Sequence, residues 1–150
     1  MKLHGRVALV TGASRGIGAG IAKCMAREGA VIVVNYFRSG EEARLVVKEI
    51  EDAGGSAIPI KADVGDYSQV EQMVGQAISA FGKVDILVSN AGIPSPHKPL
   101  IDMTHKEFTE VINNHLVGAY NCAHIVLPYM RQNERGDIQF ISSRVTDLHP

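Results

Sequence analysis

Three glycines near the amino end of the chain, Gly12, Gly16 and Gly18, are spaced as in loops that bind a phosphate. They follow four apolar residues, Val7 to Val10, and precede a stretch of helical periodicity, which predicts a buried strand, a tight turn and a helix start. The first N–H groups of a helix lack intrahelical partners and carry partial positive charge, so small residues there leave room for a phosphate. The same glycines also suit an ordinary strand-to-helix turn. Because no Gly-Lys-Ser or Gly-Lys-Thr follows, the loop differs from an ATP or GTP P-loop.

The elements that must position this loop repeat along the chain. Short runs rich in Val and Ile alternate with longer segments of helical periodicity. We predict strands over residues 7–10, 31–35, 57–61, 85–89 and 136–141, and helices over 16–28, 41–53, 67–81 and 106–131. This alternation predicts an α/β fold: a doubly wound parallel sheet of βα repeats that stops after strand five, with helices on both faces. A ligand of such a sheet binds outside the carboxyl ends of its strands.

Local signals refine these elements. Pro59 predicts an edge position for strand 57–61, because proline cannot donate to the ladder. Thr104 followed by Glu107 predicts a capping box at the start of the last helix, and Pro128 predicts a kink or an early end there. On the first helix we expect one apolar face made of Ile17, Ile21, Cys24 and Met25.

Composition limits the classes of function. The 150 residues are 45% hydrophobic and suffice for one domain, and the balance of 15 basic and 16 acidic residues argues against a nucleic-acid partner. No apolar run approaches the roughly 18 residues of a membrane span, so we expect a cytoplasmic protein with no membrane partner. Cys24 and Cys122 are expected to be buried free thiols, and the six histidines show no ligand spacing, so we expect no metal site.

Four motifs together resemble one family. They are residues 11–18 (Thr-Gly-x-x-x-Gly-x-Gly), Asp63-Val64, residues 89–92 (Ser-Asn-Ala-Gly) and residues 136–143 (Gly-x-Ile-x-x-Ile-Ser-Ser). In this order they resemble the amino-terminal portion of a short-chain dehydrogenase/reductase, and more broadly its 3-oxoacyl thioester reductases. The resemblance implies an NAD(P)-binding Rossmann domain over residues 1–150. It also implies an oxidoreductase that transfers hydride between a nicotinamide and a small carbonyl or alcohol substrate.

Charge predicts which coenzyme is used. A site for NAD(H) places a carboxylate about 20 residues after the glycine loop, to bind the ribose hydroxyls. Here Asn35 stands at the end of the second strand, and Arg15, Arg38 and Ser39 could hold a 2′-phosphate, which favours NADP(H) over NAD(H). The two arginines could instead be ordinary solvated residues. The implied coenzyme-binding residues are Gly12, Ser14, Arg15, Gly16, Ile17, Gly18, Asn35, Arg38, Ser39, Asp63, Val64, Asn90, Ala91 and Gly92. Asp63 could alternatively cap the next helix.

The resemblance also assigns catalytic roles. Ser143 matches the catalytic serine, with Ser142 as its neighbour and competitor, and His115 stands where the family has an asparagine that supports a proton-relay water. An imidazole could hold the same water, or it could make only a structural hydrogen bond. The family's Tyr-x-x-x-Lys pair is expected beyond Pro150, so we expect the chain alone to be inactive. A non-catalytic homologue that binds coenzyme or a partner is the alternative. A full-length form is expected to be a homo-tetramer or dimer.

Overall fold

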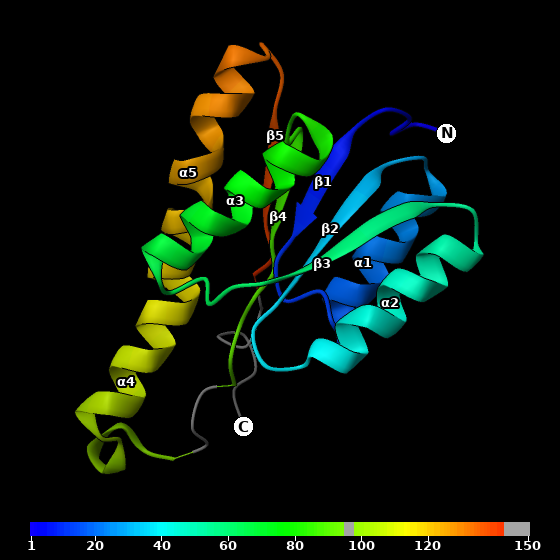
Figure 1. The fold of residues 1–150 in the computed structure, drawn as a ribbon. Helices are drawn as coiled ribbons and strands as arrows, with labels where there is room; N and C mark the ends of the chain where they lie inside the picture. The colour runs from blue at the N-terminus through cyan, green and yellow to red at the C-terminus, as the bar shows by residue number, and fades with distance from the viewer. Residues whose placement is uncertain (95–97, 143–150) are drawn as a thin grey trace.

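The computed structural model describes residues 1–94 and 98–142, which form a five-stranded parallel sheet between two layers of helices (Figure 1). The strand order is β3-β2-β1-β4-β5, which confirms the predicted doubly wound arrangement and places Pro59 on an edge strand. The strands are β1 (Val7–Val10), β2 (Val31–Tyr36), β3 (Ser56–Lys61), β4 (Ile86–Ser89) and β5 (Asp137–Phe140). The helices are α1 (Gly16–Arg27), α2 (Gly40–Asp52), α3 (Tyr67–Phe81), α4 (His105–Ile112) and α5 (Gly118–Gln132), with a 3-10 turn η1 (Leu100–Asp102) and a π-helical segment η2 (Asn113–Val117).

The core has two halves because side chains alternate between the faces of the sheet. On β1, Val7 and Leu9 pack with α3 and α5, whereas Ala8 and Val10 pack with α1 and α2. Both faces of β1 are therefore buried, which explains why its sequence is continuously apolar. Within the described ranges, no helix combines the length and the apolar character needed to cross a membrane.

The direction of winding reverses between β1 and β4. The chain moves outward from β1 to β2 and β3, then returns to pair β4 with β1 on its other side. Neighbouring strands at such a reversal send their following loops apart, which opens a crevice at their carboxyl ends. Figure 1 shows α4 extending beyond that same edge of the sheet, so the helix stands beside the crevice.

The predicted helix over residues 106–131 is confirmed in its extent, because residues 105–132 are helical without a break, but the π-helical segment η2 divides it into α4 and α5. The capping box of Thr104 and Glu107 is confirmed at the start of α4. Pro128 does not end α5, which continues to Gln132. Proline costs one backbone hydrogen bond, and the burial of neighbouring Val126 and Met130 in the core offsets that loss.

The predicted apolar face of α1 is also wrong in part. Ile17 is 69% exposed and Cys24 is exposed, so the expectation of a buried thiol holds for Cys122 and fails for Cys24. Ile21 and Met25 lie at the margin of the core. The buried face consists of small residues that let the helix lie close to the sheet: Gly18, Ala19, Ala22 and Ala26.

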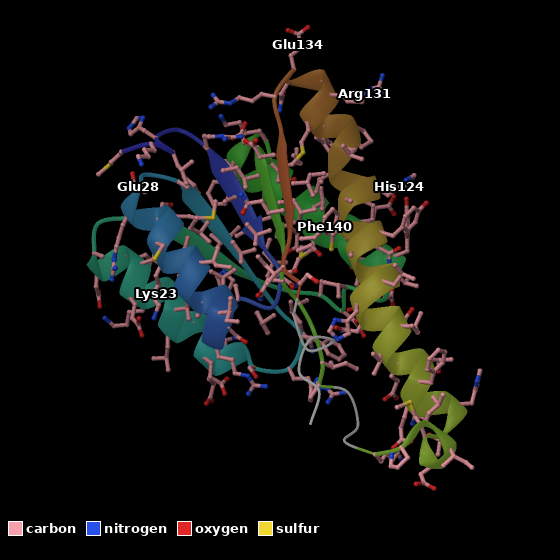
Figure 2. All side chains as sticks on the ribbon, turned by 180° about the vertical axis from the view of Figure 1, so that it is seen from behind. Lys23, Glu28, His124, Arg131, Glu134 and Phe140 are labelled. Atoms are coloured by element: carbon pink, nitrogen blue, oxygen red, sulfur yellow. The ribbon has the colours of Figure 1, made fainter. Side chains whose placement is uncertain are left out.

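Large apolar side chains are also exposed on β5 and along α4, η2 and α5. On β5, an edge strand, Phe140 is exposed, and His124 and Arg131 point outward from α5 (Figure 2). A row of large apolar residues recurs along α4, η2 and α5; we call it the outer row, and it comprises Phe108, Ile112, Leu116, Tyr120 and Leu127.

Candidate functional site

Thr11 and Asn90 join β1 to β4 at the crevice. The hydroxyl of Thr11 accepts hydrogen bonds from the backbone N–H groups of Asn90 and Ala91, each at 2.9 Å. The Asn90 side-chain amide donates to the backbone carbonyls of Thr11 at 2.9 Å and Gly12 at 3.3 Å. The two loops are therefore held together at the point where the strand order reverses.

The glycine turn is shaped by close contacts. A Cβ on Gly18 would lie 2.5 Å from Nδ2 of Asn90 and would also clash with the Gly12 carbonyl, so only glycine fits without a shift of the helix. Gly16 has a φ of 56°, and a Cβ added to it would meet no atom of the described residues within 4 Å. The space in front of the first turn of α1 is thus open, while its rear is tightly packed.

The amino end of α1 lacks the usual protein partners. Its N-cap residue is Arg15, no side chain among residues 1–94 and 98–142 caps the helix, and no acidic residue lies in the first turn. The free N–H groups and the partial positive charge at this end are suited to an anion. Arg15 itself is exposed beside them.

Asn35 is 1% exposed, and its side chain is used within the protein. Its carbonyl oxygen accepts from the N–H of Gly12 at 3.1 Å, and its amide donates to the carbonyl of Ala62 at 3.1 Å. A carboxylate at this position could not donate to that carbonyl. Asn35 therefore ties the glycine turn to the end of β3, and contact of its side chain with a coenzyme stays a prediction.

These loops enclose a cleft of about 490 Å³ at the carboxyl edge of the sheet. Among the predicted residues, the structure brings together on its walls Gly12, Ser14, Arg15, Asn35, Arg38, Ser39, Asp63, Val64, Ala91 and Gly92. Gly16, Ile17, Gly18 and Asn90 lie on the turn, the first turn of α1 and the β4 loop, outside this lining. Sequence reasoning missed eight further lining residues: Tyr36, Phe37, Ala62, Ile93, Pro94, Glu110, Asn113 and Asn114. The predicted Ser143 lies outside the described residues.

The wall formed by Asp63 and Val64 is fixed from behind. The Asp63 N–H donates to the side chain of Gln69 at 3.0 Å, and Asn121 of α5 donates to the Val64 carbonyl at 3.0 Å. Asn121 is buried, and Gly118 one turn earlier leaves room for the Val64 side chain. Asp63 does not cap α3, because Asp66 is the N-cap and accepts from the N–H of Gln69.

His115 lies in η2 and faces the loop after β4. Its Nε2 is 2.8 Å from the carbonyl oxygen of Ile93, and a Cβ on Gly92 would lie 2.8 Å from its Cε1. The same Nε2 is 3.3 Å from the backbone nitrogen of Ile93, so it can donate to the carbonyl when it carries the ring proton and accept from the N–H when it does not. His115 therefore connects the π-helical segment to the rim of the cleft.

The start of α4 is stabilised by charge. The Lys98 ammonium lies 2.7 Å from the Glu107 carboxylate, which also accepts from the N–H and hydroxyl of Thr104. These hydrogen bonds, with that of Lys98 the largest, lower the pKa of Glu107 to about 2. Within residues 1–94 and 98–142, no group of three or more His, Cys, Asp or Glu side chains could hold a metal ion.

Comparisons with known proteins agree with this geometry. The family model described as short chain dehydrogenase matches residues 6–149. The 3-oxoacyl-[acyl-carrier-protein] reductase FabG of Staphylococcus aureus is 43% identical over 138 residues, which cover 92% of this chain and 56% of that protein. The short chain dehydrogenase claC of Passalora fulva is 44% identical over 145 residues, covering 97% of this chain and 53% of that protein.

Solved structures are similar as well. A metagenomic short-chain oxidoreductase in complex with NADP has a TM-score of 0.91 at 37% identity, covering 95% of this chain and 64% of that one. The chain spans little more than half the length of the curated relatives it matches. The family match over nearly all its residues, with the turn and strand order described above, shows that the chain belongs to the short chain dehydrogenase family.

Proposed function

We propose that this chain binds NADP(H) in the cleft and forms the coenzyme-binding part of an oxidoreductase acting on a carbonyl or alcohol. The observation that carries the proposal is the uncapped amino end of α1, which opens at the strand reversal into the cleft that Arg15 and Arg38 line. The similar metagenomic structure in complex with NADP supports the choice of coenzyme.

The residues present fit each part of the coenzyme. The pyrophosphate would lie against the open first turn of α1, where backbone N–H groups and the helix dipole stabilise negative charge. Arg15, Arg38 and Ser39 would hold the 2′-phosphate, and the cleft wall of Asp63 and Val64 would receive the adenine. Asn90, Ala91 and Gly92 would line the path of the nicotinamide ribose.

The nicotinamide, when bound, supplies or accepts a hydride at a carbonyl or alcohol carbon. His115 would hold a water molecule for proton transfer from its position at the Ile93 carbonyl, and Ser143 would orient the substrate oxygen. A complete enzyme in which His115→Ala retains normal turnover would contradict the relay role.

We infer that the 150 residues alone turn over slowly. None of the four tyrosines is followed by a lysine four residues later, and the structure places Tyr36 at the end of β2, Tyr67 at the start of α3, and Tyr120 and Tyr129 on α5. Consumption of NADPH by the chain with 3-oxoacyl thioesters should therefore be near background. Rapid consumption would show that another group acts as the general acid.

We also propose that a full-length form of the protein associates with itself as a dimer or tetramer. The outer row exposes large apolar side chains over α4, η2 and α5, which is unusual for a surface facing only water. Sedimentation of the complete protein with Leu116→Glu should show smaller species than the unaltered protein.

Calorimetric titration tests the coenzyme assignment. We expect the chain to bind NADPH more tightly than NADH, and Arg38→Asp to reverse or abolish that preference, because a carboxylate repels the 2′-phosphate and binds the ribose hydroxyls. An unchanged preference in Arg38→Asp would remove Arg38 from the site. Absence of binding by either dinucleotide would contradict the proposed function itself.

A further inference from the structure

Phe37 and Arg38 form a contact on the loop between β2 and α2. The Arg38 Cζ lies over the Phe37 ring, 5.4 Å from its centroid, and both residues line the cleft. Within the described part of the chain, the Arg38 guanidinium takes part in no ion pair. The Phe37 ring therefore supports one face of the Arg38 guanidinium.

Burial in the core does not explain Phe37. Its side chain is 42% exposed and belongs to neither half of the described core, whereas the preceding Tyr36 packs against the half beneath α1 and α2. An exposed phenyl ring gains little from the hydrophobic effect. Its electron-rich face, however, attracts a guanidinium within about 6 Å.

We propose that Phe37 is a positioning residue that holds Arg38 for recognition of the coenzyme's 2′-phosphate; this inference rests on the proposed function. An arginine side chain has many rotamers, and binding a phosphate restricts them at an entropic cost. A guanidinium already held over a ring has lost part of that freedom. Its N–H groups lie in its own plane, so contact through one face leaves them available for the phosphate.

A direct role of Phe37 is the competing explanation. The ring also borders the cleft and could stack on the adenine, which would strengthen binding of every adenine nucleotide alike. Support of Arg38 would strengthen only nucleotides that carry a 2′-phosphate. Adenosine 2′,5′-bisphosphate and 5′-AMP differ in that group alone, so the pair of ligands separates the two roles.

The experiment is calorimetric titration of the 150-residue chain with both nucleotides. We expect Phe37→Leu to weaken binding of the bisphosphate about 2- to 5-fold, equivalent to about 0.5–1 kcal/mol, and to leave 5′-AMP unchanged. Phe37→Tyr keeps a ring of similar shape and should restore the wild-type affinity. In an Arg38→Gln background, Phe37→Leu should have no further effect on the bisphosphate.

Phe108→Leu is the matched control, because Phe108 is similarly exposed, at 47%, and lies on α4 outside the cleft lining. Equal losses for both nucleotides in Phe37→Leu, or no loss for either, would overturn this inference alone. If the wild-type chain binds both nucleotides equally, the choice of NADP(H) fails and this inference fails with it.

Discussion

Replacing Thr11 by valine tests whether one hydroxyl holds the two loops of the cleft together. Valine has nearly the same shape, so the change removes the hydroxyl and leaves the space filled. The backbone N–H groups of Asn90 and Ala91, both 2.9 Å from that oxygen, would then lose their acceptor. Thr11 itself is 1% exposed, so water cannot easily take the place of the hydroxyl.

The magnitude follows from those two donors. Each donor left without a partner in the interior costs about 1–3 kcal/mol, and because these two groups are only partly buried we expect about 2–4 kcal/mol in total. For a chain of this length that corresponds to a fall in Tm of about 5–15 °C. Thr11→Ser keeps the acceptor and loses one methyl group, which should cost about 1 kcal/mol.

Urea denaturation and thermal unfolding, followed by circular dichroism, measure the stability of the wild-type chain, Thr11→Val and Thr11→Ser. Coenzyme affinity should also fall in Thr11→Val, because the loop after β4 lines the cleft. If Thr11→Val lost no more stability than Thr11→Ser, the hydroxyl would not be supporting the two loops.

Three further predictions concern buried polar groups, thiols and acid. Asn121→Leu should lower the free energy of unfolding by about 1–3 kcal/mol and weaken coenzyme binding, because it removes the partner of a buried carbonyl on the cleft wall. A thiol reagent at pH 8 should modify Cys24 quickly and Cys122 only after unfolding, because Cys24 is exposed whereas burial raises the pKa of Cys122 to about 12. The hydrogen bond from Lys98 lowers the pKa of Glu107 from 4.5 to about 2, so its carboxylate stabilises the fold above about pH 4.5 and this contribution is lost as the pH falls toward 2. Glu107→Gln should remove that part of the pH dependence of unfolding.

Each of these has a clear contrary result. An unfolding free energy unchanged in Asn121→Leu would mean that the Val64 carbonyl finds another donor. Equal modification rates of the two thiols in the folded chain would contradict the burial of Cys122. A Glu107 carboxyl whose pKa by NMR is near 4.5 would show that neither the Lys98 hydrogen bond nor the capping box is formed in solution.

The parallel sheet could be predicted because parallel strands covered on both faces require continuous apolar runs. β2 is an example, since four of its six residues are buried. Its Val-Ile-Val-Val run contains no polar residue, so it lacks the alternation of polar and apolar faces that an amphipathic helix would show. The reversal of strand order, by contrast, followed from rules of connection and from no individual residue.

The divided helix and the face of α1 were not predictable from apolar periodicity. The pattern of apolar residues continues through η2, so it does not reveal the change from α to π hydrogen bonding. On α1, Ile17 carries more apolar surface than Ala19 or Ala22, yet the close approach of the helix to the sheet admits only the small residues. On this helix the close packing against the sheet, and not the hydrophobicity of each side chain, determines which residues are buried.

The glycine turn and Asn90 could be predicted because local chain geometry requires their residue types. Phe37 and Glu110 were missed because only the folded arrangement brings them to the wall of the cleft. Phe37 comes from the loop after β2, and Glu110 comes from α4, which extends beyond the edge of the sheet. Asn121 did carry a signal, since it is a polar residue beside the apolar Cys122, Ile125 and Val126 of the same helix.

The π-helical segment constrains how relatives can be aligned with this chain. A π turn holds one residue more than an α turn, so deleting one residue from Asn113–Val117 would allow an unbroken α-helix. Because an α turn would then replace the longer π turn, α4 and α5 would keep nearly the same orientation about the helix axis. The change would be confined to the segment itself, which holds His115 at the Ile93 carbonyl and Asn113 at the Gly65 carbonyl. A one-residue gap in a relative therefore belongs within Asn113–Val117, because a gap elsewhere between Thr104 and Gly118 would pair residues that occupy different sides of the helix.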